Sequence, residues 1–192
     1  MIGYDDYFKP LPAFQSDRLI LRALKMSDAA DLFACCREPE VSRYSEWYPH
    51  PDLAHSRAYI SWMLSEYRRK EGTTFAVCRR ESGRLIGTCS YIGLDLEHKV
   101  SELGYCLAKD SWGMGYGAEA AFILLDHGFR RLGLHRMEAR VMPENERSVR
   151  VLEKLGMERE GRMRKAIYCK GADHNLDLYA ITDERFFRLF GR

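Results

Sequence analysis

Three glycines at alternate positions mark the segment Trp112-Gly113-Met114-Gly115-Tyr116-Gly117-Ala118 as the strongest candidate for chemistry in this chain. Glycine adopts positive φ values and lets a ligand approach the backbone closely. The segment opens an amphipathic helix, whose first N–H groups lack partners and lie at the positive end of the helix dipole. This combination favours binding of a phosphate or diphosphate, and a turn without a ligand is the alternative.

The same segment formally matches a dinucleotide-binding fingerprint, with Gly113, Gly115 and Ala118 at the G-x-G-x-x-A positions. In a dinucleotide-binding fold the first glycine directly follows its strand, whereas here residues 108–112 intervene. The short connections between the preceding strands also indicate antiparallel neighbours rather than a β-α-β unit. A phosphate-binding turn in another kind of fold is therefore the preferred interpretation.

Hydrophobic periodicity predicts the elements that must position this segment. The expected strands are residues 18–24, 73–79, 84–91, 101–107, 136–141, 158–168 and 175–181. The expected helices are one capped by Ser27 or Asp28, then residues 52–69 and 116–132, and finally a short helix that Asn145 caps and Gly156 ends. This order predicts an α+β fold with one mixed sheet and helices on both faces.

Composition indicates one globular domain over residues 16–192, preceded by an N-terminal arm at residues 1–15. The 30 basic and 28 acidic side chains nearly balance, which excludes nucleic-acid binding through bulk charge. Positive charge is concentrated in residues 130–170, which carry 12 basic and 6 acidic side chains. The chain shows no signal peptide and no apolar run of about 18 residues, so we expect a cytoplasmic protein without a membrane span.

The six cysteines show no C-x-x-C spacing, which is typical of reduced, buried thiols in the cytosol. The adjacent pair Cys35-Cys36 lies on an expected helix and is interpreted as structural. The six histidines are scattered without ligand spacing. No metal site is therefore expected.

Four segments together resemble the GNAT acetyltransferase superfamily. Residues 112–118 resemble its acyl-CoA loop Q/R-x-x-G-x-G/A, with Trp112 in place of Gln/Arg, as in the branch of the ribosomal-protein N-terminal acetyltransferases. Residues 17–22, 102–105 and 145–157 resemble other motifs of that branch, and the resemblance covers about residues 16–182. It implies a mixed, twisted sheet splayed near its middle. It also implies acetyl transfer from acetyl-CoA to a primary amine by direct attack in a ternary complex.

The resemblance implies a set of acetyl-CoA contacts. Backbone N–H groups of residues 113–118 would hold the diphosphate, and the edge of residues 105–107 would pair with the pantetheine and polarise the thioester carbonyl. Asn145 would bond to the pantetheine while capping its helix. The expected cofactor-binding residues are Tyr105, Cys106, Leu107, Trp112, Gly113, Met114, Gly115, Tyr116, Gly117, Ala118, Asn145 and Ser148.

The resemblance also implies catalytic roles for an acid and a base. Many family members carry a tyrosine acid where this chain has Leu152, which cannot donate a proton. In the ribosomal-protein branch a serine takes that role and matches Ser148, whose alternative role is to cap the helix. Glu160 matches the position of the branch's base, and Glu102 is the second candidate. Glu160 could instead be one more exposed residue of a charged run.

The acceptor amine is the least defined part of the reaction. An α-amine has an ordinary pKa of about 7.7–8.0 and a lysine of about 10.4, so an α-amine demands less of its base. We therefore expect a protein N-terminus, such as that of a ribosomal protein, as the acceptor, and a monomer or homodimer as the enzyme. A polyamine or an aminoglycoside is an alternative acceptor, and a catalytically silent acyl-CoA-binding module is the other alternative. The residues expected to line the acceptor pocket, unless they belong to the core, are Trp47, Tyr48, Tyr91 and Tyr168, with Trp62.

Overall fold

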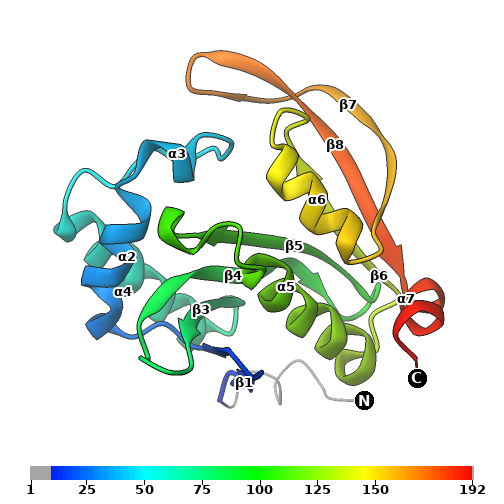
Figure 1. Ribbon diagram of the computed structural model, residues 1–192, viewed down its shortest axis with the longest axis horizontal. Helices are drawn as coiled ribbons and strands as arrows, with labels where there is room; N and C mark the ends of the chain where they lie inside the picture. Colours follow the sequence, from blue (N-terminus) through cyan, green and yellow to red (C-terminus); the bar gives the residue numbers. More distant parts are fainter. Residues whose placement is uncertain (1–9, 192) are drawn as a thin grey trace.

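A single sheet of eight strands, in the order β1-β2-β3-β4-β5-β6-β8-β7, organises the computed structural model, which describes residues 10–191 (Figure 1). The strands are β1 (Phe14–Gln15), β2 (Leu19–Arg22), β3 (Thr74–Arg79), β4 (Leu85–Asp95), β5 (Val100–Leu107), β6 (Arg136–Val141), β7 (Glu158–Cys169) and β8 (Ala172–Thr182). All neighbours are antiparallel except β5 and β6, so the sheet is mixed as expected. Within the expected N-terminal arm, residues 1–9 lie outside the described residues, and Phe14 and Gln15 form β1.

The sheet splays between its two parallel strands. β5 pairs with β6 only from Val100 to Glu102, where Glu102 lies opposite Glu138. Beyond that point β5 continues to Leu107 alongside β4, while β6 continues to Val141 alongside β8. The two halves of the sheet therefore diverge, and α6 (Glu146–Lys154) lies along the second half (Figure 1). The predicted splay is confirmed.

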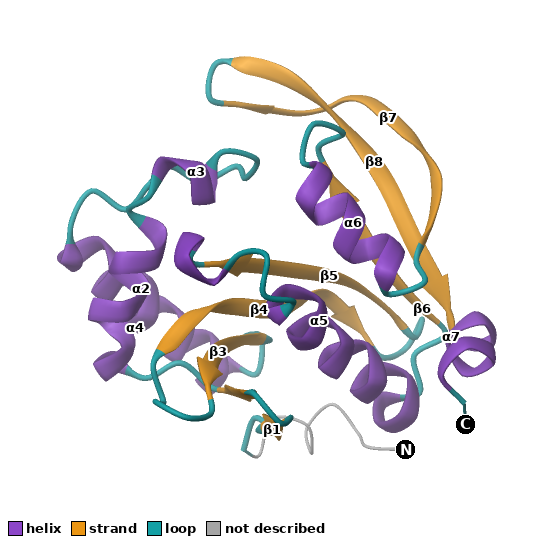
Figure 2. Ribbon diagram, in the orientation of Figure 1, coloured by secondary structure: helices purple, strands orange, loops and turns teal. Residues whose placement is uncertain are grey.

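Helices cover both faces of the sheet (Figure 2). α2 (Ala29–Cys36) and α4 (Leu53–Arg69) lie on one face, with the short α3 (Pro39–Ser42) after α2. α5 (Tyr116–His127) and α6 lie on the other face. Each face has its own buried apolar cluster, which we call the α5-side core and the α2-side core. Among the residues 10–191, no helix is both long and apolar enough to cross a membrane.

Strand β5 divides its side chains between these two cores, as its alternating pattern predicts. Leu103, Tyr105 and Leu107 pack in or against the α5-side core. Cys106 packs against the α2-side core. Glu102 shares the parity of Cys106 and therefore lies on the face opposite to Tyr105. This alternation assigns the side chains of one strand to two different environments.

Three features of the helices differ from the predicted elements. The helix expected over residues 116–132 changes into a π-helical turn at Gly128–Leu132, where a Cβ on Gly128 would lie only 3.1 Å from Leu134. α3 is a single turn with Pro39 at its first position, too short for a periodicity signal. α7 (Asp183–Phe190) was not predicted, and the Thr182 side chain caps it by accepting from the Arg185 N–H.

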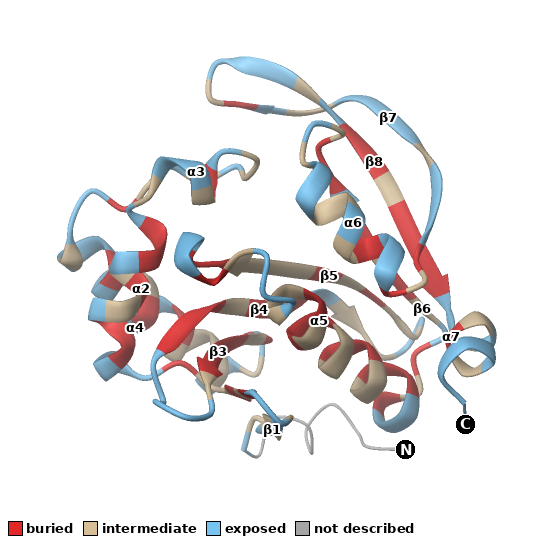
Figure 3. Cartoon of the chain, viewed as in Figure 1, coloured by how far each residue is buried: buried red, intermediate tan, exposed pale blue. Residues whose placement is uncertain are grey.

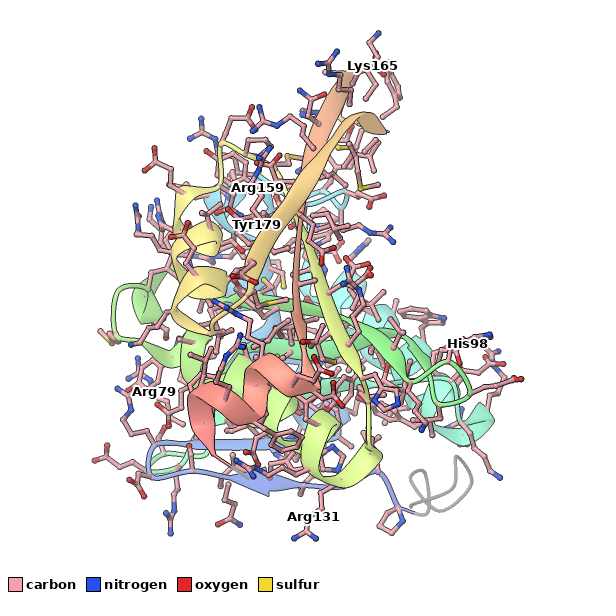
Figure 4. The ribbon with its side chains drawn as sticks, turned by 90° about the vertical axis from the view of Figure 1, so that its right-hand side faces the viewer. Arg79, His98, Arg131, Arg159, Lys165 and Tyr179 are labelled. Carbon is pink, nitrogen blue, oxygen red and sulfur yellow. The ribbon has the colours of Figure 1, made fainter. Side chains whose placement is uncertain are left out.

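The hairpin of β7 and β8 extends beyond the other strands, with Lys165 at its outer end (Figure 4). β7 is an edge strand and most of its residues are exposed (Figure 3). Asp177 on β8 is buried and accepts hydrogen bonds from Arg159 and Arg162 on β7. These charged contacts hold the outer strand to the sheet.

Candidate active site

A cavity of about 500 Å³ opens where the sheet splays, between the C-terminal half of β5, the N-terminus of α5 and helix α6. Eleven of the twelve residues expected to bind the cofactor line it. The exception is Met114, whose side chain is half exposed. The structure therefore brings together three sequence motifs that lie up to 43 residues apart, from Tyr105 to Ser148.

The glycine turn presents open backbone to this cavity. Gly113 and Gly115 have φ values of +76° and +80°, which favour glycine. A Cβ on Gly113 would meet no atom within 4 Å, and one on Gly115 would approach only the Arg18 guanidinium, at 3.5 Å. Gly115 is the N-cap of α5 and provides no side-chain cap for the first N–H groups of the helix. The turn thus keeps the space and the donors that a diphosphate needs.

Arg18, directly before β2, binds this turn and the first residues of α5. Its guanidinium donates to the Met114 carbonyl at 3.0 Å and to the Glu119 carboxylate at 2.7 Å. It also stacks on the Tyr116 ring, 4.7 Å from the centroid. Arg18 belongs to a motif that carried the family resemblance, but its contact with the turn follows only from the tertiary structure.

A hydrogen bond from Trp112 links the turn to the end of β5. Its indole N–H donates to the Leu107 carbonyl at 2.8 Å, and the Arg147 guanidinium lies 4.1 Å from the centre of its ring system. The cavity is lined by one acidic side chain, Glu40, and by four basic side chains: Arg43, Arg147, Arg150 and Lys154. Three of the four come from residues 130–170, where the sequence concentrates positive charge. This surplus suits a ligand with several phosphates.

A pair of hydroxyl groups spans the middle of the cavity. Tyr105 Oη and Ser148 Oγ lie 2.8 Å apart, and Tyr105 also donates to the Ser148 carbonyl at 3.3 Å. Asn145 caps α6 by accepting from the Ser148 N–H at 3.3 Å. Burial raises the pKa of Tyr105, so its hydroxyl stays protonated. Leu152, at the position of the usual tyrosine acid, is buried in the α5-side core.

Glu102 occupies the point at which the sheet splays. It is the last residue of β5 paired with β6, and its carboxylate lies 3.4 Å from Arg140 Nε. Burial raises the pKa of Glu102, and the nearby Glu138 carboxylate acts in the same direction while Arg140 opposes it. A carboxylate with a raised pKa accepts a proton more readily than an exposed one.

Glu160 lies away from the cavity and forms an ion pair with Arg136. Arg136 Nη1 donates to its carboxylate at 2.8 Å, and a second bond makes the pair bidentate. Hydrogen bonds from Arg136 lower the pKa of Glu160. Glu160 lines a separate, smaller hollow with Glu158 and Arg185. The register of β6, β8 and β7 brings Glu160 next to Arg136, and no local sequence pattern predicts this ion pair.

None of the aromatic residues expected at the acceptor pocket lines the cavity, and two of them belong to the cores instead. Tyr91 is 1% exposed in the α5-side core, and its hydroxyl donates to the Leu124 carbonyl at 2.6 Å. Trp47 packs against the α2-side core. Tyr48, Trp62 and Tyr168 are exposed and line neither hollow. Tyr44, which was not expected, lines the cavity from the segment after α3.

Comparison with known proteins agrees with this geometry. Residues 18–158 match the family described as "Acetyltransferase (GNAT) domain". The N-acetyltransferase YoaA of Bacillus subtilis (strain 168) is 33% identical over 174 residues, covering 91% of this chain and 98% of that protein. YdaF of the same strain, named as a ribosomal N-acetyltransferase, is 33% identical over 99 residues, covering 52% and 54%. The crystal structure of a GNAT-family acetyltransferase from Bacillus anthracis superposes with a TM-score of 0.82 at 25% identity, covering 90% and 99%.

The splayed mixed sheet, with its cavity beside a glycine turn, defines an acetyltransferase fold. The chain belongs to the GNAT acetyltransferase family.

Proposed function

We propose that this protein binds acetyl-CoA in the 500 Å³ cavity and transfers the acetyl group to the α-amine of a protein N-terminus. One observation carries the proposal: the glycine turn, the free end of β5 and the Tyr105–Ser148 pair all border one continuous space. The turn suits the diphosphate of acetyl-CoA, the end of β5 suits its pantetheine arm, and the hydroxyl pair suits its thioester. The name of the relative YdaF supports a ribosomal protein as the acceptor.

The cavity fits the polar parts of acetyl-CoA. Backbone N–H groups of residues 113–118 bind the diphosphate, and the basic side chains of α6 offset the negative charge of the phosphates. Beyond Glu102, β5 has no β6 partner, so residues 105–107 offer backbone donors and acceptors to an extended arm. When bound, acetyl-CoA supplies a thioester whose carbonyl carbon accepts the amine nitrogen.

Glu102 is the proposed general base. It lies at the splay, on the face of β5 opposite to Tyr105 and outside the lining of the cavity, so the amine would have to approach from that face. Its raised pKa suits a group that takes a proton from an ammonium or an attacking amine. Glu160 is less suited, because both of its oxygens bind Arg136 and its pKa is lowered.

The Ser148 hydroxyl is the proposed donor to the leaving sulfur. In the proposed arrangement Tyr105 donates its single hydroxyl proton to Ser148 Oγ rather than to the Ser148 carbonyl, which leaves the Ser148 proton free to point into the cavity. A hydrogen bond at that position stabilises the negative charge that develops on sulfur. Complete proton transfer is unnecessary, since a thiol has an ordinary pKa of about 8.5 and the thiolate takes its proton from water on release.

Release of free thiol from acetyl-CoA tests the proposal over matched acceptors. One peptide carries a free N-terminus and an acetylated lysine, and its partner carries an acetylated N-terminus and a free lysine. We expect at least about tenfold higher kcat/KM for the first peptide at neutral pH, because its amine is partly unprotonated there. Faster turnover of a polyamine or an aminoglycoside would contradict the acceptor, and acetyl-CoA binding without turnover of any amine would contradict the activity.

A further inference from the structure

Three thiols meet between helix α2 and strand β5, next to the cavity. The Sγ atoms of Cys35, Cys36 and Cys106 all lie within 4.8 Å of one another. Cys35 and Cys36 are buried, whereas Cys106 is half-buried and borders the cavity. All three cysteines are free thiols. We refer to these residues as the thiol trio.

We propose that the thiol trio binds one thiophilic metal ion of the Zn²⁺ or Cd²⁺ class. Thiolate sulfur is a soft ligand that such ions prefer. A Zn–S bond of about 2.3 Å places two sulfurs of a tetrahedral site about 3.8 Å apart. The observed spacing of at most 4.8 Å therefore needs a contraction of no more than about 1 Å, which small side-chain rotations provide.

Rigid elements present all three sulfurs. The His50 N–H donates to the Cys36 carbonyl at 3.0 Å and holds the last turn of α2. Cys106 lies opposite Thr88 in the ladder between β4 and β5. A site on packed elements loses little conformational entropy when the ion binds. The trio is therefore arranged before the ion arrives, apart from the side-chain rotations.

Cys106 is the member of the trio that borders the cavity. Cys35 and Cys36 belong to the α2-side core together with Ile60 and Met63, so the ion cannot enter from that direction. Cys106 borders the cavity, where water can supply the fourth ligand that zinc takes at an open site. A metal ion binds the thiolate form of cysteine, so binding of the ion releases protons from the trio.

The ion would also tie α2 to the strand that faces the cofactor cavity, because Cys106 lies on the part of β5 that has no β6 partner. Any ligand that binds only the folded state raises its stability. We therefore expect bound metal to raise the melting temperature of the protein. This inference is independent of the acceptor and of the acetyl-transfer activity.

Titration of reduced, metal-free, full-length protein with Cd²⁺ under anaerobic conditions tests the proposal. We expect one equivalent to bind with sulfur-to-metal charge-transfer absorbance and with a rise in melting temperature. Cys106→Ser keeps the volume but replaces the soft ligand, and should weaken binding at least about tenfold, since changes at residues that only support a metal ligand already cost about 10–100-fold. Cys78→Ser, a buried thiol of the same core outside the trio, is the matched control and should bind as the parent does.

Absence of charge-transfer absorbance at one equivalent would overturn the proposal, and so would unchanged affinity in Cys106→Ser. Circular dichroism of each metal-free variant establishes that it is folded. If Cys106→Ser does not fold, Cys36→Ser takes its place with the same expected loss. Competition against a chromophoric chelator then gives the corresponding affinity for Zn²⁺.

Discussion

The hydroxyl of Tyr105 on β5 lies 2.8 Å from the hydroxyl of Ser148 on α6, so a hydrogen bond joins this strand to the helix on the other side of the splay. The two residues are 43 positions apart in sequence. Tyr105 borders the space proposed for the pantetheine arm, and Ser148 sits in the first turn of the helix that faces it. The bond orients the Ser148 hydroxyl at the place where the thioester sulfur is expected.

Ser148→Ala should lower kcat about tenfold, equivalent to about 1.4 kcal/mol, because the lost hydrogen bond strengthens only as charge develops on sulfur. The KM for acetyl-CoA should change less than about threefold by the same reasoning. Tyr105→Phe should act through Ser148, so the double variant should be no slower than Ser148→Ala. Steady-state thiol release measures all three, and additive losses would mean that the two hydroxyls act separately.

Glu102→Gln should lower kcat about 100-fold, the usual contribution of a general base. The raised pKa of Glu102 means that kcat of the parent falls as the pH drops through that pKa, since a protonated carboxyl accepts no proton. The variant should lack this acid limb. Glu160→Gln is the matched control on the same charged face and should lose less than about threefold. A larger loss of kcat in Glu160→Gln than in Glu102→Gln would contradict this assignment and make Glu160 the general base.

Gly115→Val should raise the Kd for acetyl-CoA at least about tenfold, because φ there is +80° and the side chain enters the space kept for the diphosphate. Gly83→Val is the control: its φ is +70° and a Cβ there meets no atom within 4 Å, but Gly83 lies in the turn between β3 and β4. Both changes should cost about 1–3 kcal/mol in backbone strain. Calorimetry showing equal affinity for acetyl-CoA in the two variants would reject the turn as the diphosphate site.

Asp177→Asn should lower the free energy of unfolding by about 2 kcal/mol at neutral pH, because charge-assisted hydrogen bonds from two arginines are lost. Hydrogen bonds from Arg162 and Arg159 lower the pKa of Asp177 in the folded state. Its stabilising contribution is therefore complete above the unfolded pKa of about 3.9 and is lost as the pH falls toward the folded pKa. Denaturant unfolding from pH 7 down should show the difference between parent and variant narrowing, and a constant difference would contradict this account.

Much of the fold could be predicted because its signals are local. The alternation of Leu103, Tyr105 and Leu107 predicts a two-sided strand, and the structure has it. Asn145 predicts a helix start three residues before the Ser148 N–H that it caps. α3 was missed because a single turn is too short to show a period. α7 was missed although the Thr182 cap and an amphipathic pattern are present in the sequence.

The positions of the aromatic residues could not be predicted from local sequence patterns. A tyrosine or a tryptophan can belong either to a core or to a binding pocket, and the sequence does not distinguish the two. Only the packing shows that Tyr91 and Trp47 belong to the cores. Glu160 matches a motif position, but its carboxylate binds Arg136, which lies 24 residues earlier on β6. The strand register sets that partner, so the choice between Glu102 and Glu160 needs the assembled sheet.

By itself the sequence determined the glycine turn, the helix caps and the strand alternation, and its motifs carried the resemblance to the family. These features depend on backbone geometry and on periods of two to four residues, which act over a few neighbouring positions. Only the tertiary structure decided that Tyr105 meets Ser148, that Arg18 holds the turn, and that Cys106 joins Cys35 and Cys36. Such contacts arise when strands and helices pack, because burial and register bring distant residues together without any short-range pattern to announce them.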